Sequence, residues 1–349
     1  MKRALLLLVL AGCTHGEVFS PAPHGTDRPL NDVTLPVRLT YNRGHDENVS
    51  WLPDGSGFLY TFERFRYSEG DWCVGLMPST GGRLRETLCA ETAGSLDSVD
   101  AWLWPSQGAD SLLAFVRTTS QRGQIAPTAQ NLMVVLRDRP AWAVLQMPMP
   151  YTIPGQPIHH SASRLQWLDD QSLVYRADLR GAFPPCQGCP PDTVASGRAL
   201  VLIEMAAAQY TRAVIPGTRY ASSLAMLGGD EVAYTRAGES VVYAWSRAHD
   251  TTRVLWDFGG GIARGLTIAG NRLVAIVGGA VSFDFSVPLQ DSILVDGGGP
   301  LRVVDLATGD DGIIDQFTLY RNPVLSPDGR TLIVESVARA PDLFRFDLP

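Results

Sequence analysis

Histidines and acidic residues at two places in the chain have side chains suited to acid–base or metal chemistry. One group is His45-Asp46-Glu47 and the other is His159-His160. Imidazoles and carboxylates together can bind a transition metal. However, the spacing between the two groups is uninformative, and adjacent histidines on an extended chain point to opposite sides. We therefore expect no metal and no cofactor, and assign His45, Asp46, His159 and His160 only to a candidate ligand-binding face.

Four of the five cysteines form two pairs suited to disulfide chemistry. Cys73 and Cys89 are equidistant from Gly81, the centre of an expected hairpin turn. Residues placed in this way face each other with Cα atoms about 4.5–5.5 Å apart, so we predict a disulfide. For Cys186 and Cys189, which are flanked by prolines, a second local disulfide is favoured. A redox dithiol, which needs a lowered thiol pKa, and a zinc site, which usually needs four ligands, are the alternatives.

The fifth cysteine ends an apolar N-terminal segment. Met1-Lys2-Arg3 is basic, and the run from Ala4 to Ala11 is rich in leucine. This run is too short to span a bilayer, which takes about 20 residues, and is typical of a signal peptide. Leu10-Ala11-Gly12-Cys13 resembles the lipobox of bacterial lipoproteins, which implies removal of residues 1–12 and lipidation of Cys13. Thr14, where Asp would favour inner-membrane retention, implies an outer-membrane location.

Composition separates a tether from a large body. Residues 13–35 contain several prolines and glycines and have no apolar periodicity, which predicts a flexible tether between the lipid and a domain over residues 36–349. The whole chain has 34 Gly and 24 Pro, which excludes a helix bundle and favours short strands joined by turns. The net charge of −7 excludes a basic nucleic-acid-binding surface.

The body consists of repeats that each begin with two strands joined by a tight turn. Trp51–Tyr60 and Leu325–Val334 both contain Pro-Asp-Gly, in which proline pre-sets φ and glycine accepts a positive φ. Weaker copies lie at residues 104–116, 167–175, 227–234 and 269–277. Each copy is followed by further strands, which predicts an all-β, six-bladed β-propeller of four-stranded antiparallel blades. A seventh blade within the long fifth copy is the alternative.

The last copy lacks a fourth strand, because the chain ends after its third. The segment Val37–Tyr41, just before the first copy, has the sequence of an isolated strand. We expect it to pair with the last blade and close the ring, which leaves no open gap between the first and last blades.

These repeats resemble the TolB-type β-propellers of bacterial periplasmic proteins, a kind also found in prolyl-oligopeptidase-like peptidases. The resemblance covers about residues 37–349 and implies the fold. The peptidase activity does not carry over, because the chain has no Gly-x-Ser-x-Gly motif and no α/β-hydrolase segment. Trp51, Trp104 and Trp167 lie at the ends of inner strands, where aromatic side chains normally pack between blades. A ligand platform is the alternative for them.

Long loops are expected on one face of the propeller. They cover Thr118–Gln130, Pro148–Ser163, Ala177–Arg198 and Gly278–Pro300, and long loops in compact domains are usually functional or disordered. We therefore predict a lipid-anchored propeller of the cell envelope, attached to the outer membrane on its periplasmic or outer side. It would act as a non-catalytic binding or scaffold module for a protein, peptide or glycan. The alternative is an envelope enzyme of the hydrolase or lyase type with its site on this loop face.

Overall fold

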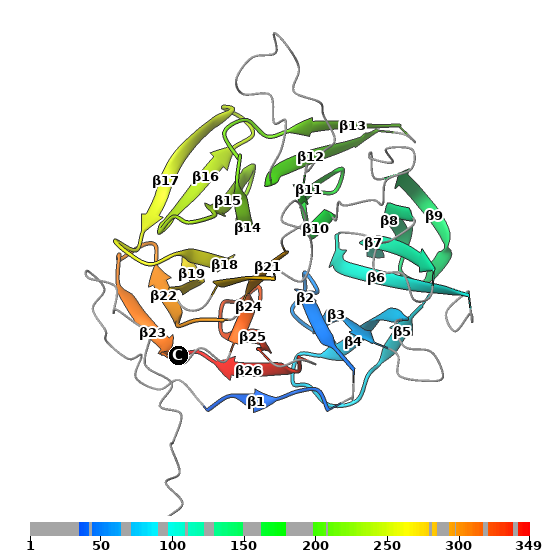
Figure 1. Ribbon diagram of the computed structural model, residues 1–349, viewed down its shortest axis with the longest axis horizontal. Coiled ribbons are helices and arrows are strands. Elements are labelled where there is room, and N and C mark those ends of the chain that lie inside the picture. Colours follow the sequence, from blue (N-terminus) through cyan, green and yellow to red (C-terminus); the bar gives the residue numbers. More distant parts are fainter. Residues whose placement is uncertain are drawn as a thin grey trace, which may run out of the picture.

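The computed structural model is a ring of antiparallel β-sheets around a central axis (Figure 1). We use the word channel for the region around this axis, where the first strands of the sheets face one another. It describes residues 35–349 except 42–43, 64–70, 90–96, 109–110, 122–128, 149–161, 179–197, 207–208, 279–280, 285–292, 297, 317–319 and 338–340. The predicted lipidation site Cys13, the tether, the pair Cys186 and Cys189, and the histidines His159 and His160 lie outside the described residues.

The described strands form six four-stranded units, which we call blades 1 to 6 in chain order. Blade 1 contains β2 (Asp46–Trp51), β3 (Gly57–Glu63), β4 (Trp72–Pro78) and β5 (Glu86–Leu88). Blade 2 contains β6 (Ser98–Gln107), β7 (Leu112–Gln121), β8 (Ala129–Leu136) and β9 (Arg139–Pro148). Blade 3 contains β10 (Ala162–Asp169), β11 (Ser172–Asp178), β12 (Arg198–Ala206) and β13 (Gln209–Val214). Blades 1 and 2 share one eight-stranded sheet through a single parallel pair, Trp72 with Ala101.

The second half of the ring repeats the pattern. Blade 4 contains β14 (Ala221–Gly228), β15 (Glu231–Arg236), β16 (Val241–Ser246) and β17 (Thr251–Asp257). Blade 5 contains β18 (Ala263–Ala269), β19 (Arg272–Val277), β22 (Leu301–Asp305) and β23 (Asp311–Asp315). Blade 6 contains β24 (Tyr320–Leu325), β25 (Thr331–Ser336), β26 (Leu343–Asp347) and, from the other end of the chain, β1 (Val37–Arg38). The fold is therefore the predicted propeller.

The fifth blade carries an insertion between its second and third strands. The described part of this insertion is a two-stranded sheet of β20 (Val281–Asp284) and β21 (Ile293–Asp296). Within the described residues, the insertion thus adds a hairpin to blade 5 and not a seventh four-stranded blade.

The core lies between blades, because each sheet packs against a neighbour on both faces. The second strands are accordingly apolar on both sides, and Leu59, Leu113 and Leu173 are completely buried. In contrast, the outer strand β17 is mostly exposed. This gradient explains why second strands read as continuous apolar runs, whereas an outer strand such as β17 contains several polar residues.

The Pro-Asp-Gly turns have the chemistry expected from their sequence. In the first turn Gly55 has a φ of 70°, and the Ser56 amide donates to the Asp54 carboxylate at 3.0 Å. This bond and the one from the Ser56 hydroxyl lower the pKa of Asp54. The last turn repeats the arrangement, with Gly329 at a φ of 70° and Asp328 accepting from a backbone amide.

The N-terminal strand closes the ring, as predicted. Val37 of β1 pairs with Arg345 of β26, and the Leu39 amide donates to the Leu343 carbonyl at 2.8 Å. Figure 1 shows the first strand, in blue, beside the last, in red. The two ends of the described chain therefore share one sheet.

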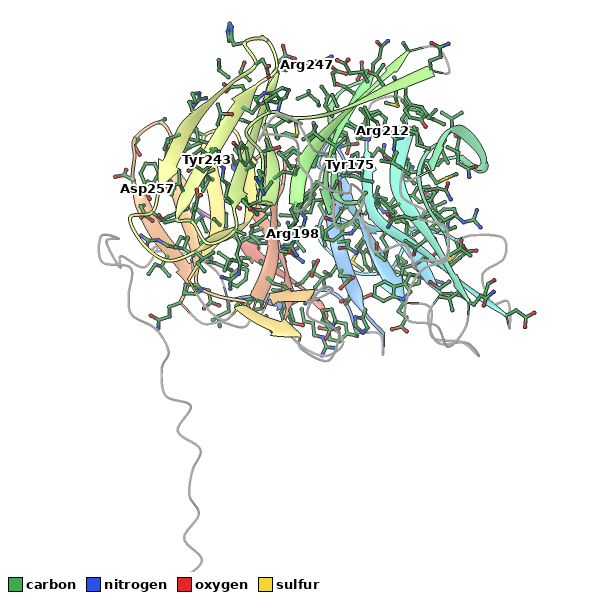
Figure 2. All side chains as sticks on the ribbon, turned by 45° about the horizontal axis from the view of Figure 1, so that its top comes forward. Tyr175, Arg198, Arg212, Tyr243, Arg247 and Asp257 are labelled. Atoms are coloured by element: carbon green, nitrogen blue, oxygen red, sulfur yellow. A yellow bond between two sulfur atoms is a disulfide. The ribbon has the colours of Figure 1, made fainter. Side chains whose placement is uncertain are left out.

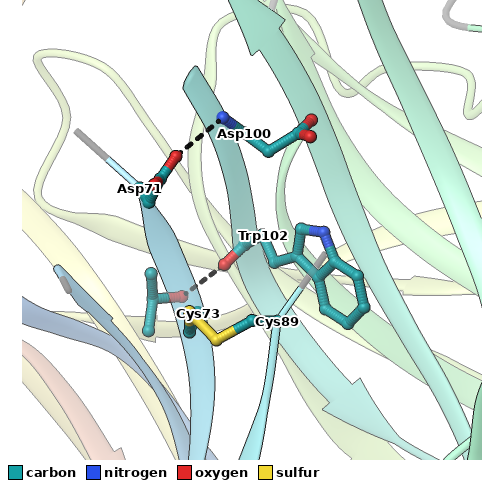
Figure 3. Close-up of a disulfide and its surroundings, with 6 residues drawn as sticks. Asp71, Cys73, Cys89, Asp100 and Trp102 are labelled. Carbon is teal, nitrogen blue, oxygen red and sulfur yellow. Dashed lines mark hydrogen bonds between the residues drawn. A yellow bond between two sulfur atoms is a disulfide. The ribbon is translucent and has the colours of Figure 1, made fainter. Parts of the chain in front are cut away.

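The predicted disulfide joins Cys73 and Cys89 (Figure 3). Its S–S distance is 1.99 Å and its Cα atoms are 4.7 Å apart. Val74 pairs with Leu88 in the adjacent register, which confirms that the hairpin is centred on Gly81. The bond ties the short outer strand β5 to β4, at the side of blade 1 that faces blade 2.

The channel has two different ends. At the turn end, short turns join the first and second strands and the third and fourth strands. At the loop end, the second strand leads to the third and the fourth leads to the next blade. Figure 2 shows Arg247, in the β16–β17 turn, far from Arg198, which begins β12 at the loop end. Arg247 bridges blades 4 and 3 by pairing with Asp169 at 2.7 Å and Glu204 at 2.5 Å.

Candidate functional site

A repeated bulge bends the inner strands where they line the channel. The pairing between first and second strands shifts register at the same place in every blade. In five blades a residue at this shift has a left-handed backbone: Asn48 at a φ of 59°, Trp104 at 55°, Arg164 at 55°, Gly265 at 59° and Asn322 at 47°. These residues form a ring across the channel, which we call the bulge ring.

Two members of the bulge ring are chemically unexpected. Glycine adopts a positive φ freely, and asparagine does so at modest cost. For Trp104 and Arg164 the same conformation costs about 1–3 kcal/mol, and such strain tends to be kept at functional sites. The side chains of these two residues are therefore the first to consider as functional.

A cavity of about 430 Å³ extends from the bulge ring to the turn end of the channel. This volume is within the range of about 300–1,000 Å³ typical of small-molecule sites. All six blades contribute to its walls. The lining includes Asn48, Trp51, Trp104, Gln107, Arg164, Gln166, Trp167, Leu227, Ile268, Asn322, Val324 and Glu335.

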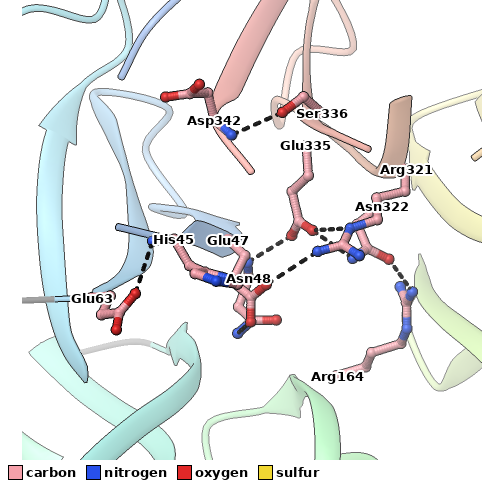
Figure 4. Close-up of polar contacts among 10 residues, drawn as sticks. All are labelled: His45, Glu47, Asn48, Glu63, Arg164, Arg321, Asn322, Glu335, Ser336 and Asp342. Carbon is pink, nitrogen blue, oxygen red and sulfur yellow. Dashed lines mark hydrogen bonds and ion pairs between the residues drawn. The ribbon is translucent and has the colours of Figure 1, made fainter. Parts of the chain in front are cut away.

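A buried carboxylate organises the floor of this cavity (Figure 4). Glu335 of β25 is 0% exposed and accepts from the Asn48 amide at 2.7 Å and the Asn322 side-chain amide at 2.8 Å. It also accepts from Arg321 Nε at 3.1 Å. Because Asn48 belongs to blade 1 and the other residues to blade 6, Glu335 fastens the seam where the ring closes.

Glu47 is the second carboxylate of this seam. It accepts from Arg321 at 3.3 Å and from the Asn48 side chain at 3.3 Å, and its side chain is 19% exposed. Burial, followed by the charge of Glu335, raises the pKa of Glu47 to about 7, while Arg321 opposes the rise. At neutral pH, Glu47 thus exists in both protonation states, which suits a general acid or base.

Arg164 spans the channel above this seam. It extends from blade 3 and donates to Asn322 Oδ1 of blade 6, which lies three positions away in the ring of six (Figure 4). Its guanidinium carbon lies 5.6 Å from the centre of the Trp104 ring, in the range of a cation–π contact. The charged group is therefore oriented by contacts with two other blades.

Two glutamines on the same side of the cavity present amide donors. Gln107 Oε1 accepts from Arg137 at 2.6 Å, and Gln166 Oε1 accepts from the Met226 backbone amide at 3.0 Å. Because Arg137 and a backbone N–H can only donate, these bonds fix the orientation of both side-chain amides. Within the described residues, the two Nε2 groups have no protein acceptor, so they remain able to donate to a ligand.

The predicted ligand-face residues that the structure describes lie at the start of β2. His45 packs against Trp72 with ring centres 5.2 Å apart, and its backbone amide donates to Glu63. Asp46 is 0% exposed. Burial raises the pKa of Tyr60, and the charge of Asp46 adds to the rise. The structure thus brings His45 to the loop end of the channel, whereas Asp46 is an interior residue with no solvent-facing surface.

The tryptophans have different environments. Trp51 is 8% exposed and packs edge-on against Phe58, which agrees with the expected core role. Trp104 and Trp167 are half-buried and line the cavity. Trp167 also donates to the Ser106 carbonyl at 3.0 Å, which links blades 3 and 2.

Sequence reasoning missed most residues of this site, although the repeat contains a signal for some of them. Asn48, Arg164 and Asn322 each lie three residues before the start of a repeat motif, at Trp51, Trp167 and Leu325. Alignment of the repeats on these positions shows a polar residue in these three copies, whereas Ala101, Leu224 and Leu266 occupy the position in the other three. In contrast, nothing in the local sequence marks Glu335 as a buried carboxylate.

The residues that the structure describes contain neither a metal-binding cluster nor a membrane-spanning helix. Among them, no group of three or more histidine, cysteine, aspartate and glutamate side chains is arranged to hold a metal ion. In the same part of the chain, no helix has the length and apolar character to cross a membrane.

Comparison with known proteins relates the chain to other propellers through structure. No protein-family profile and no curated protein sequence matches the chain. A gluconolactonase from Xanthomonas campestris aligns over 92% of this chain and 91% of its own, with a TM-score of 0.52 and 13% identity. An oligogalacturonate lyase from Vibrio parahaemolyticus aligns over 90% of this chain and 93% of its own, with a TM-score of 0.50 and 11% identity.

Propellers of the WD40 type are similar to the same degree. The WD40 repeats of RRP9 align over 92% of this chain and 99% of their own, with a TM-score of 0.53 and 10% identity. The similar structures thus include enzymes and a WD40-repeat protein. At these identities the similarity concerns the fold, and by fold this chain is a β-propeller.

Proposed function

We propose that this chain is a non-catalytic ligand-binding module of the bacterial cell envelope that holds its ligand in the central channel. The observation that carries the proposal is the cavity above the bulge ring. There, strained Trp104 and Arg164 converge from two blades and two glutamine amides remain able to donate. The same bulge is served elsewhere by glycine or asparagine, so the bulge itself does not require tryptophan or arginine at these two positions.

The proposed location rests on the lipobox-like sequence ending at Cys13. A lipid on this residue would hold the propeller at the outer membrane through the tether of residues 13–35. Such a position suits a receptor or scaffold that meets its ligand in the envelope. The WD40-type neighbour supports a binding role to the extent that the fold serves protein interaction elsewhere.

The test is to isolate the full chain from envelope extracts and identify co-purifying molecules by mass spectrometry. Ile268→Trp places a large side chain in the wall of the cavity, whereas Val254→Trp places the same side chain on the exposed strand β17. We expect the ligand with the wild type and Val254→Trp but not with Ile268→Trp. Retention by a correctly folded Ile268→Trp variant would refute the channel as the site. Stoichiometric metal in the wild type would refute the metal-free, non-catalytic assignment.

A second candidate is an envelope enzyme of the hydrolase or lyase type that acts at the loop end. The observation in its favour is Glu47, whose pKa of about 7 suits proton transfer. Glu47 lies at the start of β2, two residues after His45. The gluconolactonase and lyase neighbours show that enzymes also use this fold. If an activity is found, Glu47→Gln should abolish it and Ile268→Trp should not, because Ile268 lies toward the turn end.

A further inference from the structure

We propose that the outer rim of the propeller, where the segment around β1 meets blade 1, docks on an anionic phospholipid bilayer. Five exposed side chains form this docking surface, which we call the rim surface: Leu35, Val37, Tyr41, Arg83 and Arg85. The proposal goes beyond the channel cavity, because it concerns the outside of the ring. It rests on the proposed location at a membrane, since it names the part of the propeller that would meet the lipid.

Exposed apolar side chains gather around β1, which is the outermost strand of blade 6 (Figure 1). Leu35 is 87% exposed, Val37 is 48% exposed and Tyr41 is 73% exposed. In the part of the chain that the structure describes, the other large apolar side chains classed as exposed are Val214, Tyr220, Val254 and Val337. Three such side chains within seven residues are therefore a local concentration of apolar surface.

The β4–β5 hairpin packs directly beside these side chains. Leu39, between Val37 and Tyr41, is buried, and a Cβ atom added to Gly81 would lie 2.7 Å from Leu39 Cδ2. Leu84 of the same hairpin packs against the apolar cluster that contains Leu39. The hairpin turn is therefore held against the segment that bears the exposed apolar residues.

The same hairpin supplies unpaired positive charge. Arg83 and Arg85 lie on either side of Leu84 in the chain, and both are exposed. Within the described ranges, neither guanidinium has a hydrogen-bond or ion-pair partner. Because arginine always carries a charge in proteins, these side chains place two positive charges beside the apolar residues.

Acidic side chains close to the rim surface are already paired. Glu86 is 3.7 Å from Arg137 Nε, and Asp342, just before β26, is 2.6 Å from Arg38. These carboxylates therefore do not neutralise the two arginines of the rim surface. Because the net charge of the chain is −7, this positive region is a local departure from the overall charge.

Each residue type suits the interface of an anionic bilayer. Leucine and valine bury apolar surface at the boundary between head groups and acyl chains. Tyrosine is enriched at this depth, because its ring is apolar and its hydroxyl is polar, and arginine is attracted by anionic head groups. The Arg38 guanidinium carbon lies 4.7 Å from the Tyr41 ring centre, and the Tyr41 hydroxyl donates to the Arg38 carbonyl at 3.2 Å. These contacts fix the position of the exposed ring.

The place of the rim surface in the chain favours a membrane over another partner. Leu35 follows the predicted lipidation site Cys13 by 22 residues, a length that spans at most about 75 Å. The rim surface thus includes the part of the propeller nearest along the chain to the predicted lipid. Linkage through one chain makes docking intramolecular, so a surface of modest affinity is sufficient.

The experiment is hydroxyl-radical footprinting of the full chain reconstituted in vesicles, with oxidation of each side chain measured by mass spectrometry. One kind of vesicle is phosphatidylcholine alone, and the other also contains phosphatidylglycerol. Oxidation of Val37 is divided by that of Val254, which is 59% exposed, and oxidation of Tyr41 by that of Tyr220, which is 50% exposed. Each control side chain has the same chemistry as the one it is compared with and lies elsewhere on the ring.

Both oxidation ratios should be about threefold or more lower on the anionic vesicles, because each arginine near an anionic surface favours attachment about fivefold. A docked side chain is shielded from radicals that form in water. Equal ratios on the two kinds of vesicle would overturn the proposal. Protection that increases with the protein-to-lipid ratio would also overturn it, since that result would indicate contact with a second copy of the chain.

A pair of double variants tests the role of charge. Arg83→Gln with Arg85→Gln removes the charge of the rim surface, whereas Arg212→Gln with Arg253→Gln removes the same charge from exposed positions on β13 and β17. We expect the difference between the vesicles to disappear in the first variant and to persist in the second. A difference that persists without Arg83 and Arg85 would overturn their assignment. The wild-type comparison involves no substitution, so it decides the proposal even if a variant does not fold.

The footprint also separates this proposal from the proposed location. A protein that does not stay with the neutral vesicles has no lipid anchor, so the location fails. The same two ratios, compared between anionic vesicles and vesicle-free solution, then decide the rim surface. A protein that stays with both kinds of vesicle but gives equal ratios supports the anchor and overturns the rim surface.

Discussion

The carboxylate seam between the first and last blades predicts a pH dependence of stability that Glu47→Gln should remove. Glu47 has a folded-state pKa of about 7 against 4.5 for an ordinary glutamate, mainly because burial disfavours its charged form. Between these values the folded protein binds more protons than the unfolded chain does. The stabilisation that comes from this extra proton on Glu47 is fully present below pH 4.5. It is lost as the pH rises through about 7, so the folded state is less stable at alkaline pH.

The magnitude follows from this difference in pKa. Each unit of pKa difference between the folded and unfolded states is worth about 1.4 kcal/mol, which gives about 3 kcal/mol for Glu47 between pH 4.5 and pH 8. Because the side chain is only 19% exposed, solvent screening removes little of this value. Glutamine has nearly the same shape but no titration, and it can keep the hydrogen bond from the Asn48 side chain.

The assay is urea unfolding of the wild type and Glu47→Gln at pH 5 and pH 8. The free energy of unfolding of Glu47→Gln minus that of the wild type should be about 2–3 kcal/mol larger at pH 8 than at pH 5. Glu231→Gln, which breaks an exposed pair with Arg253, is the control, since exposed pairs contribute at most about 1 kcal/mol. The electrostatic argument for this seam would be refuted if the difference in free energy of unfolding between the wild type and Glu47→Gln did not change with pH. A change of the opposite sign would refute it as well.

Three further predictions concern other parts of the chain. Cys13→Ser should abolish incorporation of labelled fatty acid and release the protein from the membrane fraction, and continued lipidation would disprove the lipobox assignment. Replacing Cys73 and Cys89 together with alanine should lower the free energy of unfolding by about 3 kcal/mol, because a loop of this length constrains the unfolded chain, as denaturant titration would show. In the same titration, Gly265→Ala should lower the free energy of unfolding by about 1–3 kcal/mol more than Gly270→Ala does. Both glycines have a positive φ, but only at residue 265 would the new methyl group meet another side chain, the Pro323 ring at 2.9 Å; equal losses would contradict this explanation.

Much of the fold was predictable because its determinants are local. The Pro-Asp-Gly turns fix tight connections through φ and a side-chain cap, and apolar runs mark the strands that are buried on both faces. The hairpin centred on Gly81 set the pairing of Cys73 with Cys89 through its register alone. The closing strand was predictable from a count of strands. The last repeat lacks a fourth strand, and the isolated strand before the first repeat can supply it.

The candidate site was less accessible to sequence reasoning because it depends on contacts between distant residues. Arg164 and Asn322 are 158 residues apart in the chain, and Asn48 and Glu335 are 287 apart. The repeat predicts that these strands share a channel, but it does not predict which side chains meet there. Likewise, the backbone preferences of tryptophan and arginine argue against the left-handed conformation that Trp104 and Arg164 adopt.

The amino-acid sequence by itself thus determined the repeating strand pattern, its turns, the register of one disulfide and the closure of the ring, since each depends on residues near one another or on a count of strands. Only the tertiary structure decided that a bulge recurs in the inner strands and that Trp104, Arg164 and Asn322 converge on the floor of a cavity. The physical reason is that closing the ring brings six inner strands together at one axis. The environment of each channel side chain is therefore set by blades far away in sequence, and so is the pKa of Glu47, through Arg321 and Glu335.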